Sequence, residues 1–173
     1  ITMQDYITTA IRTESIEGAN DRLLLVPQQV GEIMPVLKMI DKIDDLKKFI
    51  YYGKPMEGVQ TETLPGIDTI YIPEDKIRLL HAGLGLLTEA QEFLIPILES
   101  IMRATPLDVV NLKEELGDTM WYQAIACNVL GTTFEIEQER NIAKLSARYP
   151  DKFTEDKAIN RDLETERKVL SDA

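Results

Sequence analysis

Apolar residues recur at intervals of three and four along most of this sequence, whereas the strict alternation that is typical of strands is nearly absent. Because a helix turns once in about 3.6 residues, this spacing predicts an all-α protein. The chain is expected to form a helical bundle, with helices over about residues 3–13, 28–51, 74–103, 106–130, 133–147 and 155–169.

Glycine, proline and threonine indicate where these helices begin, bend and end. Gly53 and Gly131 are expected to end helices, because glycine adopts the left-handed conformation that follows a last turn. Thr133 is expected to cap the next helix with its hydroxyl. Proline lacks a backbone N–H, so Pro35 should kink the helix over 28–51 or mark its start, and Pro96 should interrupt the one over 74–103.

The 173 residues suit a single domain over 1–173, with its core at about 74–150, N-terminal helices over 3–52 and a C-terminal helix over about 155–169. Residues 53–73 are rich in Gly, Pro and Thr, which predicts a long loop with a short extended piece at 69–72. The apolar run at 23–26 is expected to be buried.

Charge and composition narrow the class of protein. A formal net charge of −11 repels nucleic-acid phosphates, so no nucleic-acid partner is expected. No apolar stretch reaches the roughly 18–20 residues that a membrane helix needs. The single cysteine, Cys127, excludes an internal disulfide and favours a reducing, cytoplasmic location.

Two pairs of carboxylates stand on two of the most apolar predicted helices. Glu89 and Glu92 are three residues apart, as are Glu115 and Asp118, so each pair shares one helical face. Most Glu and Asp residues are simply solvated. Two pairs on consecutive core helices instead indicate carboxylates that are at least partly removed from water.

A group of buried carboxylates needs protonation, a basic partner or a bound cation, because unpaired buried charges are costly and like charges repel. No Lys or Arg lies on either apolar run. A basic partner must therefore come from elsewhere in the fold or from another chain. The charged residues of the 28–51 helix, namely Lys42, Asp44, Asp45, Lys47 and Lys48, are expected to face solvent. Oxygen ligands alone favour Mg²⁺ or Mn²⁺. A di-iron site is excluded because the only histidine, His81, belongs to no Glu-x-x-His unit.

The segment 85–92 followed by 115–118 resembles the E-x-x-E…E-x-x-D signature of the all-α nucleoside triphosphate (NTP) pyrophosphatases. That superfamily includes MazG, dimeric dUTPases, dCTP pyrophosphatases and phosphoribosyl-ATP pyrophosphatases. Residues 46–54, 141–150 and 153–162 also look like segments of phage and bacterial MazG-like proteins. Residues 23–43 match no segment of that pattern, and the Gln and Phe at 91 and 93 and the proline at 96 depart from it.

The resemblance implies a magnesium- or manganese-dependent hydrolase that releases a nucleoside monophosphate and pyrophosphate, with one or more ions. It assigns the metal to Glu89, Glu92, Glu115 and Asp118. It also implies that Tyr122 lies at the nucleotide, and that Asn141 and Lys144 form a substrate-binding element on a later helix. Glu89 is our choice for the general base.

Positions in the predicted helices and loops suggest roles for five further residues. Arg148 shares a helical face with Asn141 and Lys144 and is a candidate phosphate contact, as is Lys54 on a loop. Arg161 is a candidate contact with a neighbouring subunit's site. We expect Trp121 to pack in the core rather than to stack on a base, and His81 to play no catalytic part.

No residue of the sequence can be assigned to a particular base, so the substrate is inferred from the resemblance alone. Phage-like similarity favours dGTP, with dCTP or dUTP next, and suggests a phage-encoded enzyme that acts in the host cytoplasm. Phosphoribosyl-ATP, and a non-enzymatic helical module that binds nucleotides or a protein, remain as alternatives. Helices that are apolar on so many faces also predict a homo-oligomer, either a dimer or a tetramer.

Overall fold

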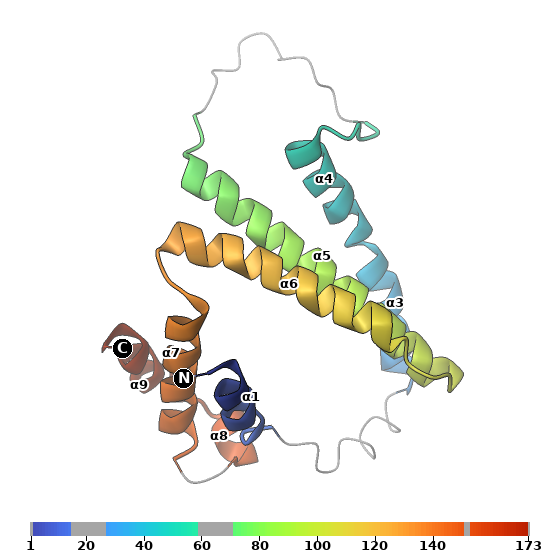
Figure 1. Cartoon of the computed structure of the whole chain (residues 1–173). Coiled ribbons are helices and arrows are strands. Elements are labelled where there is room, and N and C mark those ends of the chain that lie inside the picture. Colours follow the sequence, from blue (N-terminus) through green and yellow to red (C-terminus); the bar gives the residue numbers. More distant parts are fainter. Residues whose placement is uncertain (1, 15–26, 59–70, 151–152, 173) are drawn as a thin grey trace. The chain divides into compact units, whose positions relative to one another are not determined.

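The computed structural model describes residues 2–14, 27–58, 71–150 and 153–172. Every regular element within these ranges is an α-helix, which confirms the all-α fold. The helices, shown in Figure 1, are α1 (Met3–Ile11), α3 (Pro27–Lys38), α4 (Asp41–Tyr52), α5 (Glu74–Arg103), α6 (Val109–Leu130), α7 (Phe134–Arg148), α8 (Glu155–Ile159) and α9 (Leu163–Asp172).

The chain divides into two compact units. Helices α3 to α6 belong to the first, residues 26–130, which we call the central unit. Helices α1, α7, α8 and α9 belong to the second, residues 1–25 and 131–173, which we call the terminal unit. The assignment of one domain to the whole chain stays a prediction.

The central unit is built on α5 and α6, which lie side by side and run in opposite directions (Figure 1). Helices α3 and α4 both pack against α5. A small apolar core forms where α3 meets α5, with Leu37 and Leu98 buried at its centre. Helix α4 packs along the preceding part of α5, from Ile77 to Gln91, and reaches the predicted carboxylate Glu89 near the middle of α5.

Several expected helix ends are confirmed. Gly53 and Gly131 have φ angles of 69° and 67°, so each supplies the left-handed residue after a last turn. Thr133 caps α7, and its hydroxyl accepts a hydrogen bond from the backbone N–H of Ile136 at 3.3 Å.

The structure differs from the predicted helix boundaries at three places. Pro35 lies inside α3, so it does not mark the start of a helix, and the kink expected there stays a prediction. The predicted 28–51 helix divides later, at Met39 and Ile40, whose N–H groups bond to carbonyls three residues back. Pro96 lies inside α5, which runs unbroken for 30 residues. A proline removes one backbone hydrogen bond, and here the packing of α5 along α6 and α3 outweighs that loss. The predicted 155–169 helix is two helices, because Asp162 caps the start of α9.

The apolar run at 23–26 lies outside the described residues, as do residues 59–70 of the predicted loop. Residues 71–73 have no regular structure, so the short extended piece stays a prediction.

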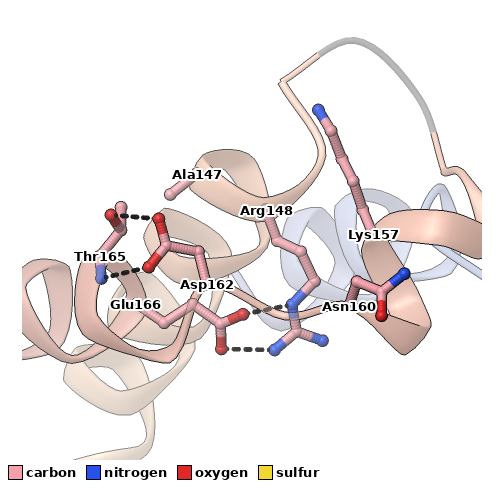
Figure 2. A pocket seen from close by; sticks show the side chains of 7 residues that line it. All are labelled: Ala147, Arg148, Lys157, Asn160, Asp162, Thr165 and Glu166. Carbon is pink, nitrogen blue, oxygen red and sulfur yellow. Dashed lines mark hydrogen bonds and ion pairs between the residues drawn. The ribbon is translucent and has the colours of Figure 1, made fainter.

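In the terminal unit, a buried carboxylate holds α9 against α7. Glu166 on α9 is 4% exposed, and Arg148 on α7 binds it with two hydrogen bonds, of 2.8 and 2.6 Å. Arg161, between α8 and α9, donates to the same carboxylate at 2.6 Å. Figure 2 shows Arg148 reaching Glu166 across a pocket that is also lined by Lys157 and Asn160.

The two arginines lower the pKa of Glu166 to about 2. A carboxylate with a depressed pKa stabilises the fold above its unfolded-state pKa, and that stability is lost as the pH falls toward the folded value. We therefore predict that Glu166→Gln lowers the free energy of unfolding by about 2 kcal/mol at pH 7. The difference from the wild type should shrink between about pH 4.5 and pH 2. Urea unfolding across that range measures it.

Glu164→Gln is the control, because Glu164 lies on the same helix and is exposed. It should change stability by less than about 0.5 kcal/mol. An effect of Glu166→Gln that is the same at pH 7 and pH 2.5 would show that the two ion pairs contribute nothing.

Candidate metal centre

Three of the four predicted metal ligands meet in the central unit. Glu89 and Glu92 on α5 and Glu115 on α6 each present one carboxylate oxygen, and these oxygens lie within 4.8 Å of one another. Glu89 and Glu115 are 8% and 6% exposed, whereas Glu92 is exposed. We call these three residues the acid cluster. Glu89 and Glu92 share one face of α5, as the spacing of three predicts, and in the structure both reach the carboxylate of Glu115 on α6.

The fourth predicted ligand, Asp118, is exposed and lies outside this group of three. Its charge nevertheless acts on the cluster, since it is among the carboxylates that raise the pKa of Glu115. Its role as a ligand stays a prediction.

Crowding and burial disfavour the charged forms of the cluster. Burial, followed by the charges of Glu92 and Glu89, raises the pKa of Glu115 to about 7. Burial, followed by the charge of Glu89, also raises the pKa of Glu92. These are the shifts expected where carboxylates repel one another in partly desolvated surroundings, and a cation relieves both causes.

A basic partner for the cluster comes from α4, and the sequence prediction for that residue was wrong. Lys47 was expected to face solvent but is 4% exposed. Its Nζ donates to Thr88 Oγ1 at 2.7 Å and to Glu89 Oε1 at 3.2 Å, and it pairs with Asp44 Oδ1 at 3.2 Å. The signal in the sequence is the spacing of Asp44, Lys47 and Tyr51, which puts them on one face of α4. That face is polar, and it packs against α5.

These contacts keep Lys47 charged. Burial lowers the pKa of its ammonium, but the neighbouring Tyr122 and Glu89 outweigh burial and raise the pKa overall. Burial likewise raises the pKa of Asp44, but hydrogen bonds from Lys48 and Lys47 lower it on balance. The acid cluster therefore lies next to the positive charge of Lys47, which is also paired with Asp44.

Tyr122 on α6 lies next to the cluster and is only 6% exposed. Its ring centroid is 5.2 Å from Lys47 Nζ, and its ring covers the backbone of Gly85 on α5. A Cβ at position 85 would overlap the ring. Glycine is thus required here for close approach rather than for a special backbone angle.

Aromatic side chains from two helices, α4 and α6, gather around His81, which lies one turn of α5 before Gly85. The ring of Tyr51 stacks on His81 with centroids 4.0 Å apart, and Tyr52 Oη lies 3.2 Å from His81 Nε2. The rings of Trp121 and Tyr122 meet His81 edge-on at 5.9 and 5.6 Å. Burial, and then the charge of Lys47, lower the pKa of His81. Trp121 is 53% exposed, so the expectation that it packs in the core was wrong.

The other predicted substrate contacts are placed as follows. Lys54 forms a surface ion pair with Asp45 at 3.0 Å. Asn141 and Lys144 lie partly buried on α7, in the terminal unit. Arg148 and Arg161, in the same unit, are both engaged by Glu166. Their roles in substrate binding stay predictions.

Residues 80–153 match the family model described as the MazG nucleotide pyrophosphohydrolase domain. The chain carries a MazG domain. The match includes Glu89, Glu92, Glu115 and Tyr122, but it begins after α4, so Lys47 lies outside it. Neither a curated protein nor a solved structure matches the chain.

The MazG domain indicates a hydrolase that acts on nucleoside triphosphates, and its family generally depends on a divalent metal. The acid cluster, made of buried and exposed carboxylates on α5 and α6, supplies oxygen ligands suited to such an ion. None of the described helices combines the length and the apolar character needed to cross a membrane.

The contact of Gly85 with Tyr122 can be tested by adding one methyl group. We predict that Gly85→Ala destabilises the protein by roughly 1–3 kcal/mol, because the new Cβ must displace the Tyr122 ring. Gly83→Ala is the matched control, since the same helix has open space at position 83. It should leave stability unchanged or raise it by up to about 1 kcal/mol, because alanine favours a helix. Thermal unfolding of both variants measures this, and equal effects would refute the close contact.

Proposed function

We propose that the protein hydrolyses a nucleoside triphosphate at the α-phosphorus, giving the monophosphate and pyrophosphate, with Mg²⁺ or Mn²⁺ held by the acid cluster. The observation that carries this proposal is the meeting of Glu89, Glu92 and Glu115 inside the MazG domain. Three carboxylates with no sulfur or imidazole among them fit a hard cation better than zinc. Asp118 is proposed as a fourth ligand, because its charge already acts on Glu115.

The bound ion would neutralise charge on the phosphate oxygens and lower the pKa of a bound water. For the protein's own residues, we propose that Glu89 orients that water and accepts its proton. Glu89 suits this role because it is buried and because Lys47 and the Thr88 hydroxyl hold its Oε1. A carboxylate fixed in this way loses little freedom when it acts.

The aromatic cluster around His81 supports a nucleotide as the substrate. Trp121 and Tyr52 are 53% and 59% exposed beside His81, and exposed rings offer a surface on which a base can stack. We propose dGTP as the preferred substrate, on the strength of the phage-like segments alone, with dCTP and dUTP next. Asn141, Lys144 and Lys54 are kept as proposed phosphate contacts. Arg148 and Arg161 could serve only by exchanging Glu166 for phosphate.

A pyrophosphate-release assay tests this function. With the common NTPs and dNTPs, dUTP and phosphoribosyl-ATP as substrates, we expect release only when Mg²⁺ or Mn²⁺ is added, and fastest with dGTP. Glu89→Gln should lower turnover at least about 100-fold, because the amide cannot accept the proton and is a poorer metal ligand. Glu99→Gln is the matched control, since Glu99 lies on the same helix and forms a surface ion pair with Arg103.

The same assay separates the alternatives. Rapid release from phosphoribosyl-ATP alone would change the substrate class. No release from any substrate, together with nucleotide-dependent quenching of Trp121, the only tryptophan, would indicate a binding module without catalysis. Full activity in Glu89→Gln would remove Glu89 from the chemistry.

We also propose that the chain forms a homo-oligomer, with a dimer as the smallest unit. Leu80, Leu87, Leu94 and Ile101 follow one another at intervals of seven along α5 and are 50%, 41%, 36% and 49% exposed. At about 100° per residue this stripe lies roughly opposite the acid cluster on the helix. In the chain by itself, α5 is therefore not buried on all sides. A continuous exposed apolar stripe is typical of a surface that another protein chain covers.

Light scattering after gel filtration tests the oligomer. The wild type should elute with at least twice the mass of one chain, and the double variant Leu87→Glu/Leu94→Glu should elute as a monomer, because four charges cannot be buried in a dimer contact. Ile159→Glu changes an isoleucine that is 77% exposed on α8 and should leave the mass unchanged. A monomeric wild type at micromolar concentration would contradict the proposal.

Finally, we propose that the protein acts in the cytoplasm and binds no nucleic acid. Its one cysteine is free, which suits a reducing compartment, and its acidic composition opposes binding to phosphate backbones.

A further inference from the structure

Lys47 is the only described lysine or arginine that is buried, and its ammonium ends at the acid cluster. It has three acceptors, namely Thr88 Oγ1, Glu89 Oε1 and Asp44 Oδ1, at 2.7, 3.2 and 3.2 Å. Its ammonium also lies 5.2 Å from the centre of the Tyr122 ring, so partners surround it. A buried charge that is fully paired in this way is costly to move.

The two carboxylates that contact Lys47 differ in how many cations they share. Asp44 also pairs with Lys48, so its carboxylate is shared by two lysines. Glu89 belongs to the acid cluster, and its described cationic partner is Lys47 alone. One positive charge is therefore placed permanently on a carboxylate that the proposed function assigns to a divalent ion.

Two cations that share one carboxylate oppose each other. The ammonium removes part of the negative charge that would attract the ion, and it also repels the ion directly. The metal affinity of the site then depends on Lys47 as well as on the ligands. Since α4 lies outside the residues that match the MazG family model, the family match does not account for this contact.

We infer that Lys47 is a built-in counter-ion of the acid cluster, which stabilises the cluster without metal and sets a ceiling on its affinity for a divalent cation. Lys47 is thus a positioning and charge-balancing residue rather than a catalytic one. This inference rests on the metal assignment in the proposed function. It predicts two opposite effects of removing the ammonium: the metal-free protein becomes less stable, and its affinity for a divalent cation increases.

The test is calorimetric titration of the full chain with Mn²⁺ alone, without nucleotide. Lys47→Met should bind Mn²⁺ at least about ten-fold more tightly than the wild type, since a charge at this distance is expected to change the affinity by that order. Lys48→Met is the matched control. It removes the same charge from the next residue of α4, whose side chain is 42% exposed and pairs with Asp44 alone, and it should change the affinity less than three-fold.

Unfolding temperatures separate this role from simple packing. Without metal, Lys47→Met should unfold at a lower temperature than the wild type, and saturating Mn²⁺ should close most of that gap. A lysine needed only for packing would leave the gap unchanged by Mn²⁺. Lys47→Arg keeps the charge and should bind Mn²⁺ within about three-fold of the wild type.

If Lys47→Met does not fold, Lys47→Gln replaces it, because the amide keeps a donor while removing the charge. Equal or weaker Mn²⁺ binding by the neutral variant, beside a wild type that does bind Mn²⁺, would overturn the inference and leave the proposed function intact. A wild type that binds no Mn²⁺ at millimolar concentration would overturn both.

Discussion

The cost of keeping carboxylates close together and away from water governs the centre of this protein. Glu89 and Glu115 are buried and Glu92 stands beside them, so their charges repel across a partly desolvated space. Two sources of relief are present in the chain itself. Lys47 places an ammonium on Glu89, and the pKa of Glu115 rises to about 7, which brings its protonation within reach of neutral pH. A divalent ion is the third source, and it is the one that the MazG domain implies.

This constraint also explains why α4 belongs to the centre although it lies outside the family match. Helix α4 packs on α5 through the polar side chains of Asp41, Lys47 and Tyr51 instead of through a purely apolar face. On α6, the Tyr122 ring packs closely on α5 because residue 85 is a glycine, and the same ring contacts Lys47. The central unit has only a small apolar core, at Leu37 and Leu98, so polar contacts hold a large part of α4 in place. Function and stability therefore depend on the same few side chains.

Local periodicity was enough to predict which segments are helical and that Glu89 and Glu92 share a face, because both follow from 3.6 residues per turn. It did not predict the divisions between α3 and α4 and between α8 and α9. Gly53, Gly131 and Thr133 were sufficient to predict helix ends, since each of these residues acts within one helical turn. Proline was not, because packing along α6 keeps α5 continuous through Pro96 at the cost of one hydrogen bond. Lys47 was misplaced for a related reason: a lysine is normally solvated, and only a carboxylate brought from another helix makes its burial tolerable.

In the terminal unit, too, the sequence pattern predicted the position of basic residues but not their partner. The spacing of Asn141, Lys144 and Arg148 on α7 predicted a basic face that could bind phosphate. In the folded chain, Glu166 occupies Arg148 and Arg161 together, although eighteen residues separate Arg148 from Glu166. Periodicity tells which face a charge occupies, but it cannot tell which distant group neutralises that charge. Lys47, which was expected to face solvent, contacts the acid cluster. Arg148 and Arg161, which were candidate substrate contacts, both bind Glu166 instead.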